Sequence, residues 1–155
     1  MSEPSAQELL RALHDRASIV DLVCKYAVSI DRRRWDDLES CFADIVELNT
    51  IRTGPGVTLP REQLVAVMRR TFETYTATQH ISANHQVTID DDRATVWSTL
   101  NATHFIAGEP DGELHQQVGY YEYRLVREQG WRIFGVQQIL SWQHGNQAIF
   151  DRTLR

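Results

Sequence analysis

The feature that most constrains the fold is a series of four long, strand-like segments in the second half of the chain. These segments lie at residues 78–89, 93–107, 114–127 and 131–142. Short turn sequences separate them, for example Glu128-Gln129-Gly130. Long strands with short connections are typical of an antiparallel meander, because parallel neighbours need a long crossover.

The first half of the chain has helical periodicity instead. Ser5 and Glu8 form a capping-box pattern ahead of a helix that should end near Asp31. The apolar residues near one stripe of this helix are Leu9, Leu13, Val20, Val23 and Ala27. A short second helix is predicted over residues 34–41, and its inward-facing residues are Trp35, Leu38 and Phe42.

One strand and a third helix are expected between these helices and the meander. Residues 45–51 alternate well enough for a strand, and Thr53-Gly54-Pro55-Gly56 is typical of a loop. The third helix should follow Thr58, and its apolar residues at spacings near four are Leu64, Met68, Phe72 and Tyr75.

Together these elements predict one α+β domain over residues 1–155, in which three helices pack on a curved, mostly antiparallel sheet. A strongly bent sheet that wraps over a long helix leaves a cone with one open end. Such a cone is a natural pocket for a small ligand.

Composition argues against several classes of function. The net charge is −5, and the basic run Arg32-Arg33-Arg34 is interpreted as a solvated turn, so we expect no nucleic-acid partner. No apolar run reaches the ~18 residues that span a membrane, and the polar N-terminus does not resemble a secretory signal. We therefore expect a cytoplasmic protein with no membrane partner. Cys24 and Cys41 fall in apolar helical patterns and are predicted to be reduced and buried.

Neither a metal nor a nucleotide cofactor is expected. His80 and His85 would point to opposite faces of a regular strand. His14, His115 and His144 lie in different predicted elements and have no ligand spacing. The sequence also lacks a glycine-rich phosphate loop after a strand and a recognisable nucleophile elbow.

Asp31 and His80 are the first candidates for chemistry. An imidazole can take and return a proton near neutral pH, although a lone histidine at the start of a strand is more often structural. A carboxylate at the C-terminal end of a helix opposes the macrodipole, so stability alone does not select Asp31. The alternative is that Asp31 caps the short helix that follows it.

His104 and Tyr26 are two further candidates. Regular pleating places His104 on a strand face of small and apolar residues, which suits a cavity wall, but the opposite face could also line a ligand. The residues of the first face are Ala94, Val96, Ser98, Leu100 and Ala102. Tyr26 flanks the helix face of Asp31, so its phenol could enter the pocket or belong to the core.

Several segments resemble one known family. The segment from Tyr26 through Asp31 to Leu38 is similar to the tyrosine–aspartate–tryptophan segment of scytalone dehydratase, SnoaL-like polyketide cyclases and bile-acid 7α-dehydratase. Thr78-Gln79-His80 and Thr103-His104-Phe105 resemble the segments that carry the two histidines of scytalone dehydratase, and residues 130–135 resemble the closing strand. The resemblance spans about residues 8–145 and implies the nuclear transport factor 2-like cone.

The resemblance also implies residue roles. Asp31 and His80 match the aspartate–histidine dyad of scytalone dehydratase, His104 matches its second histidine, and Tyr26 matches the tyrosine that contacts substrate in bile-acid 7α-dehydratase. The sequence departs from scytalone dehydratase at Ile30, which replaces a tyrosine, and near residues 119–120, where a later asparagine is missing. The dyad chemistry is therefore expected to be kept, with a substrate other than scytalone.

These observations predict a cofactor-free dehydratase that acts on a small, largely apolar, cyclic hydroxy-ketone of polyketide- or steroid-like type. The predicted substrate-binding residues are Trp35, Phe42, Leu100, Tyr120 and Trp142. The alternatives are an isomerase or cyclase that uses the same pocket, a non-catalytic ligand-binding domain, and an assembly domain like the small subunit of ring-hydroxylating dioxygenases. A homodimer or homotrimer is expected, because an exposed sheet face needs a partner surface.

Overall fold

The computed structural model describes residues 3–50 and 56–151. The helices are α1 (Ala6–Asp31), α2 (Trp35–Glu39), α3 (Arg61–Phe72) and α4 (Gln147–Asp151). The strands are β1 (Phe42–Asn49), β2 (Val57–Pro60), β3 (Ala77–Asp90), β4 (Arg93–Phe105), β5 (Leu114–Arg127) and β6 (Trp131–Gly145). Within the described ranges, no helix combines the length and apolar character needed to cross a membrane.

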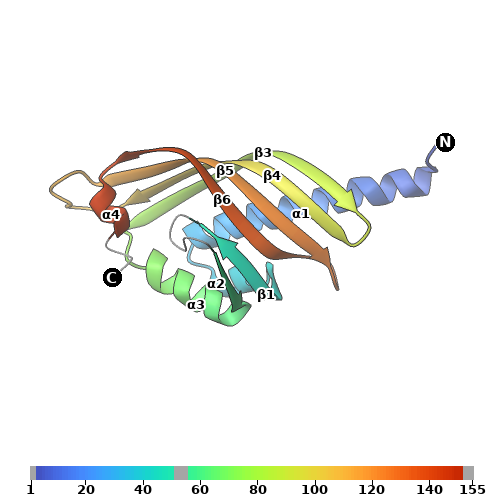
Figure 1. The fold of residues 1–155 in the computed structure, drawn as a ribbon, viewed down its shortest axis with the longest axis horizontal. Coiled ribbons are helices and arrows are strands. Elements are labelled where there is room, and N and C mark those ends of the chain that lie inside the picture. Colours follow the sequence, from blue (N-terminus) through green and yellow to red (C-terminus); the bar gives the residue numbers. More distant parts are fainter. Residues whose placement is uncertain (1–2, 51–55, 152–155) are drawn as a thin grey trace.

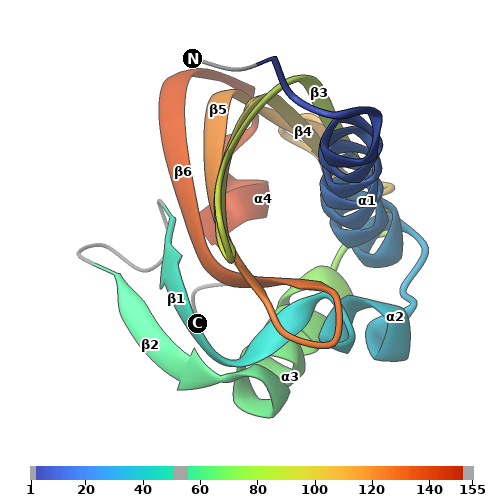
Figure 2. The same ribbon diagram turned by 90° about the vertical axis from the view of Figure 1, so that its right-hand side faces the viewer.

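All six strands belong to one sheet with the order β2-β1-β6-β5-β4-β3. Strands β3 to β6 form the predicted antiparallel meander. Strand β1 pairs parallel with β6 and antiparallel with β2, so the sheet is mixed. The sheet curls strongly, with α1 along its β3 side and α2 and α3 near β1 (Figures 1 and 2). The α+β class and the three helices packed on a curved sheet are therefore confirmed.

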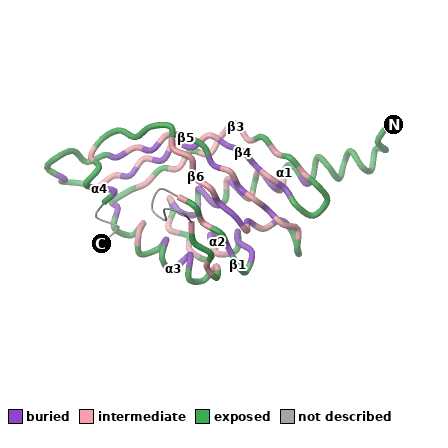
Figure 3. The backbone as a smooth tube through the Cα atoms, viewed as in Figure 1, coloured by how far each residue is buried: buried purple, intermediate pink, exposed green. Residues whose placement is uncertain are grey.

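Helix α1 begins and ends close to the predicted residues. The capping box is formed, because Ser5 Oγ accepts a hydrogen bond from the Glu8 N–H at 3.3 Å and Glu8 Oε2 accepts from the Ser5 N–H at 2.7 Å. Leu9 and Leu13, which belong to the predicted apolar stripe of this helix, are 50% and 65% exposed. The first turns of α1 extend beyond the sheet (Figure 3), so the buried stripe starts only at Asp15.

Two short elements were not predicted. Strand β2 covers Thr58, which was expected only to precede α3, and α4 follows the last strand. Helix α2 ends at Glu39, two residues before the predicted end at residue 41. Phe42, which was predicted among the inward-facing residues of this helix, is the first residue of β1. Residues 53–55 of the predicted loop lie outside the described residues.

A β-bulge in β3 changes which histidines share a face. The register with β4 shifts between Ala83 and Gln86, and Asn84 has a φ of 56°. The alternate half-buried positions are 78, 80 and 82 before the bulge and 85, 87 and 89 after it. His85 therefore lies on the same face as His80, which corrects the prediction of opposite faces, and its Nε2 lies 3.2 Å from Ser82 Oγ.

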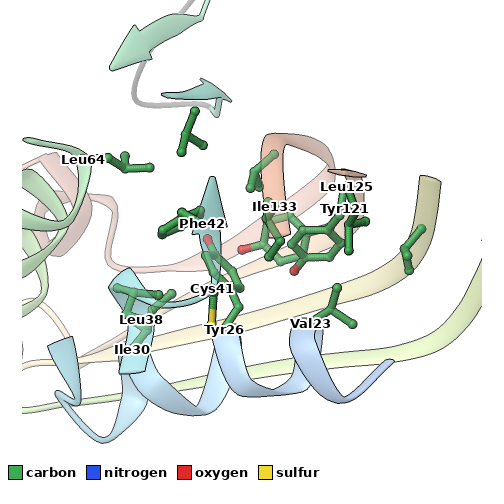
Figure 4. Close-up of a cluster of buried hydrophobic side chains, with 14 of the residues drawn as sticks. Val23, Tyr26, Ile30, Leu38, Cys41, Phe42, Leu64, Tyr121, Leu125 and Ile133 are labelled. Carbon is green, nitrogen blue, oxygen red and sulfur yellow. The ribbon is translucent and has the colours of Figure 1, made fainter. Parts of the chain in front are cut away.

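The core lies between α1 and the concave face of the sheet (Figure 4). The Tyr26 ring packs edge-on against Phe42 and Tyr123, with centroids 5.9 and 5.6 Å apart. Cys41 is buried as predicted, and burial raises the pKa of its thiol to about 11. Cys24 is only half-buried, so its predicted burial is corrected.

Candidate active site

The C-terminal end of α1 meets the start of β3, and this junction brings Asp31 and His80 together. Asp31 Oδ1 lies 2.7 Å from His80 Nδ1 and accepts a hydrogen bond from Thr78 Oγ1 at 3.0 Å. Asp31 Oδ2 accepts from the main-chain N–H of His80 at 2.7 Å. The carboxylate thus binds both the ring and the backbone of one histidine, which fixes the position of that ring relative to α1.

The structure also decides the local role of Asp31. Helix α2 begins after Arg34, and no side chain donates or accepts a capping hydrogen bond there. The Asp31 carboxylate bonds instead to β3, so the capping alternative is not realised. The side chains of His80 and Asp31 are 5% and 19% exposed. Water therefore reaches the carboxylate more readily than the imidazole.

His80 forms part of the wall of a cavity of about 120 Å³. Most of the surface that lines this cavity is apolar. The apolar side chains on the wall come from β1, α3 and α4, and they are Leu48, Val67, Met68, Phe72 and Phe150. The polar side chains on the wall are Tyr26, Thr50, Thr71, His80, His104, Gln117, Tyr121 and Gln138. The cavity therefore suits a small, largely apolar ligand with a few polar groups.

Aromatic rings hold the imidazole of His80 in place. The Phe72 ring packs edge-on against it at 5.4 Å between centroids, and the His104 ring does so at 5.7 Å. His104 in turn packs against Tyr75 at 4.7 Å. Because Asp31 binds Nδ1, Nε2 is the nitrogen of His80 that remains for a ligand.

Two phenols and two amides also lie on the polar part of the wall. Burial raises the pKa of Tyr26 and that of Tyr121, so both phenols stay protonated at neutral pH and can donate hydrogen bonds. Gln138 Nε2 donates to Gln117 Oε1 at 2.9 Å. Among the described residues, none accepts a hydrogen bond from the buried Gln117 Nε2. This amide is therefore a donor available to a ligand.

The predicted catalytic residues all lie at this site: Tyr26, His80 and His104 line the cavity, and Asp31 lies directly behind His80. The predicted substrate-binding residues do not. Phe42 and Leu100 are fully buried in the core, and Trp35 packs against that core from α2. None of the three is on the described cavity wall.

Tyr120 and Trp142 require a larger correction. They are 49% and 52% exposed and lie away from the cavity. Side chains alternate along β5, so the cavity-lining Tyr121 leaves Tyr120 on the outer face. The same alternation, counted from Tyr121, would have found Gln117, which the sequence reasoning missed.

Metal ligands do not gather in the described part of the chain, where no three His, Cys, Asp or Glu side chains are placed to hold one ion. His80 and His104 face each other, but the carboxylate at this site is already bound to His80 Nδ1.

A curved sheet closed by helices around a mostly apolar cavity defines the nuclear transport factor 2-like class. A profile of the SnoaL-like domain matches residues 11–136, and the chain therefore belongs to the SnoaL-like family within that class. No curated protein matches the chain significantly in sequence.

Solved structures support the same assignment. The Kfla4162 protein from Kribbella flavida is 31% identical, with 89% of this chain and 97% of that chain covered and a TM-score of 0.82. A scytalone dehydratase-like protein from Novosphingobium aromaticivorans is 18% identical, with coverages of 87% and 89% and a TM-score of 0.77. Hexachlorocyclohexane dehydrochlorinase LinA-type3 from Novosphingobium barchaimii is 18% identical, with coverages of 88% and 93% and a TM-score of 0.76. The last two likenesses show the shared fold.

Proposed function

We propose that this single-domain chain is a cofactor-free lyase that removes water from a small cyclic hydroxy-ketone. The observation that carries the proposal is the Asp31–His80 pair, with Nδ1 and Oδ1 2.7 Å apart, on the wall of a mostly apolar cavity. Two proteins of the same fold are named for eliminations, a scytalone dehydratase-like protein and a dehydrochlorinase. Both names support elimination as the reaction class.

In the proposed reaction, Nε2 of His80 takes a proton from the carbon next to the substrate carbonyl. The electron pair of that C–H bond forms a carbon–carbon double bond as the neighbouring C–O bond breaks. His80 then returns the proton to the departing hydroxyl, which leaves as water. Asp31 keeps the proton of the neutral imidazole on Nδ1 and stabilises the imidazolium that forms.

Hydrogen bonds to the carbonyl oxygen lower the barrier to this proton transfer. Tyr26 and His104 line the cavity together with His80 and are the proposed donors. The phenol of Tyr121 lies on the same wall and adds a third. A donor placed where negative charge develops can contribute roughly 3 kcal/mol.

The size of the cavity narrows the substrate class. Its volume of about 120 Å³ is close to that of a cavity of roughly 150 Å³ that binds benzene in another protein. One six-membered ring therefore fits inside, whereas a steroid nucleus would have to extend through the opening. The Gln117 amide on the cavity wall favours a second oxygen on that ring.

The test is turnover of a panel of single-ring hydroxy-ketones, followed by the absorbance of the conjugated product and by the loss of water in mass spectrometry. We expect turnover by the parent protein and its loss in His80→Gln. The exposed His144 on β6 provides a matched control, His144→Gln, which should keep the parent rate. Parent-like turnover by His80→Gln would refute the proposed base.

Other outcomes favour the other functions. Exchange of a substrate carbon-bound proton without loss of water indicates an isomerase or cyclase. A ligand recovered unchanged from the parent protein, with binding independent of Asp31, indicates a binding domain. A stable, co-purifying larger subunit indicates an assembly domain.

The outer face of the sheet is the proposed contact surface of a homodimer or homotrimer. Trp97 and Tyr120 line one shallow groove there, and they are 41% and 49% exposed. Trp142 on the neighbouring β6 is paired in register with Val118 of β5. Large aromatic side chains exposed together on a sheet face are typical of an interface.

A further inference from the structure

The backbone at the end of α1 has a conformation that normally selects glycine. The Arg33 N–H donates to the Ile30 carbonyl at 3.2 Å, and the Arg34 N–H donates to the Ser29 carbonyl at 2.9 Å. These two bonds form a Schellman motif in which Arg33 takes the left-handed position, with a φ of 55°. A side chain with a Cβ is strained there, so the backbone does not explain why an arginine occupies this position.

The side chain of Arg33 connects to the dyad through one hydroxyl group. Arg33 Nη1 donates to Thr78 Oγ1 at 2.9 Å and to the Ile30 carbonyl at 2.6 Å. Thr78 Oγ1 donates to Asp31 Oδ1 at 3.0 Å. Because a guanidinium only donates and a carboxylate only accepts, the single hydroxyl hydrogen must point toward Asp31. The chain of hydrogen bonds therefore runs in one direction, from Arg33 through Thr78 to Asp31.

We infer that Arg33 is a positioning residue, which holds the Asp31 carboxylate oriented toward His80 through Thr78. The bond to the Ile30 carbonyl also places a cation at the negative end of the α1 dipole, where the Asp31 carboxylate alone is unfavourable. The catalytic importance of this role rests on the proposed function, but the hydrogen-bond chain can be tested without a substrate.

The other charged and titratable groups around the pair come from several elements. Glu73, which follows α3, acts on Arg33 together with Asp31 and opposes the effect of burial, which lowers the pKa of the guanidinium. His104 of β4 faces the His80 ring. The phenols of Tyr26 and Tyr121 share the cavity wall with His80. Of these groups, Arg33 is the one that bonds to the hydroxyl in contact with Asp31.

The conformation of Arg33 allows structural and positioning roles to be separated. Arg33→Gly removes the guanidinium but suits the left-handed backbone, so its melting temperature should equal or exceed that of the parent. Arg33→Lys restores a cation that can donate to Thr78. The neighbouring Arg32 is exposed, so Arg32→Gln makes the same change in net charge without touching the chain of hydrogen bonds.

The measurement is the proton NMR signal of the His80 Nδ1–H, assigned with the His80→Gln variant, and its rate of exchange with water. We expect exchange to be about tenfold faster in Arg33→Gly, close to the parent rate in Arg33→Lys, and unchanged in Arg32→Gln. Parent-like exchange in Arg33→Gly overturns the inference, as does an equal acceleration in Arg32→Gln. A fall in melting temperature that accompanies the acceleration assigns Arg33 a structural role only. If exchange is faster in Arg33→Gly but the parent protein has no dehydratase activity, the positioning role of Arg33 stands and the proposed function is refuted.

Discussion

Replacing Asp31 by asparagine changes one acceptor atom into a donor at the centre of the site. In the parent, both carboxylate oxygens accept hydrogen bonds. Oδ2 accepts from the main-chain N–H of His80, and Oδ1 accepts from the Thr78 hydroxyl and lies 2.7 Å from His80 Nδ1. In Asp31→Asn, the amide nitrogen must face one of these donors. If the amide oxygen keeps the main-chain bond, the amide nitrogen faces His80 Nδ1, which must then be the unprotonated nitrogen.

The size of the effect follows from this exchange of partners. With the proton of the neutral imidazole moved to Nε2, His80 can no longer act as a base toward the cavity, and a loss of on the order of 10³ to 10⁴ in kcat is expected. The loss of charge-assisted hydrogen bonds at a largely buried site should lower the free energy of unfolding by about 2 kcal/mol.

The assays are urea denaturation, kcat on the identified substrate, and the nitrogen NMR shifts that report which ring nitrogen carries the proton. Asp37→Asn is the matched control, because Asp37 forms an ion pair with Lys25 at 3.5 Å on the surface of the protein. This control should retain the parent rate. An Asp31→Asn variant with the parent rate, or with the proton of His80 still on Nδ1, would refute the reasoning.

Three further predictions concern other parts of the molecule. Asp15 accepts hydrogen bonds from Arg127 at 2.7 and 2.8 Å, and these bonds lower the pKa of Asp15 in the folded state. The ion pair therefore stabilises the folded protein at pH values above the pKa of Asp15 in the unfolded chain. This stabilisation is lost as the pH falls through the pKa of Asp15 in the folded state. Urea denaturation of Asp15→Asn should therefore show a loss of about 2 kcal/mol at neutral pH that shrinks below about pH 4, whereas an equal loss at both pH values would contradict the role of this ion pair. In calorimetry, Gln117→Leu should weaken the binding of an oxygen-bearing ring about tenfold and leave the affinity for the same ring without that oxygen unchanged. Equal losses of affinity for both ligands would exclude the proposed hydrogen bond. Trp142→Arg should shift the mass measured by light scattering toward the monomer, and an unchanged mass would remove Trp142 from the proposed interface.

The meander could be predicted because its strands are long and its turns are short. Strand β2 and helix α4 were missed because 4 and 5 residues carry too little periodicity to stand out. The bulge at Asn84 was also invisible in the sequence pattern, since one inserted residue shifts the face of every later side chain in β3. His85 was therefore placed on the wrong face.

The site shows a similar division. Asp31 and His80 are 49 residues apart, and only the packing of α1 against β3 brings them together. The local pattern therefore indicated each residue only as a separate candidate, and the family resemblance predicted that they form a pair. Tyr120 and Trp142 are large aromatic residues of the kind that bind a ring system, but they lie outside the cavity wall. Residue type favours ligand contact, but the face of the strand decides it. Arg33 was interpreted as part of a solvated turn because its left-handed backbone is not visible in the sequence.

The most direct test of the central claim is proton exchange at the carbon next to the carbonyl of a bound cyclic ketone that has no leaving group. The ketone is incubated in heavy water with the parent protein, with His80→Gln and with His144→Gln, and deuterium incorporation is followed by NMR. The account predicts catalysed incorporation with the parent and with His144→Gln, and only the uncatalysed rate with His80→Gln. Incorporation at the parent rate with His80→Gln would contradict proton transfer by this histidine.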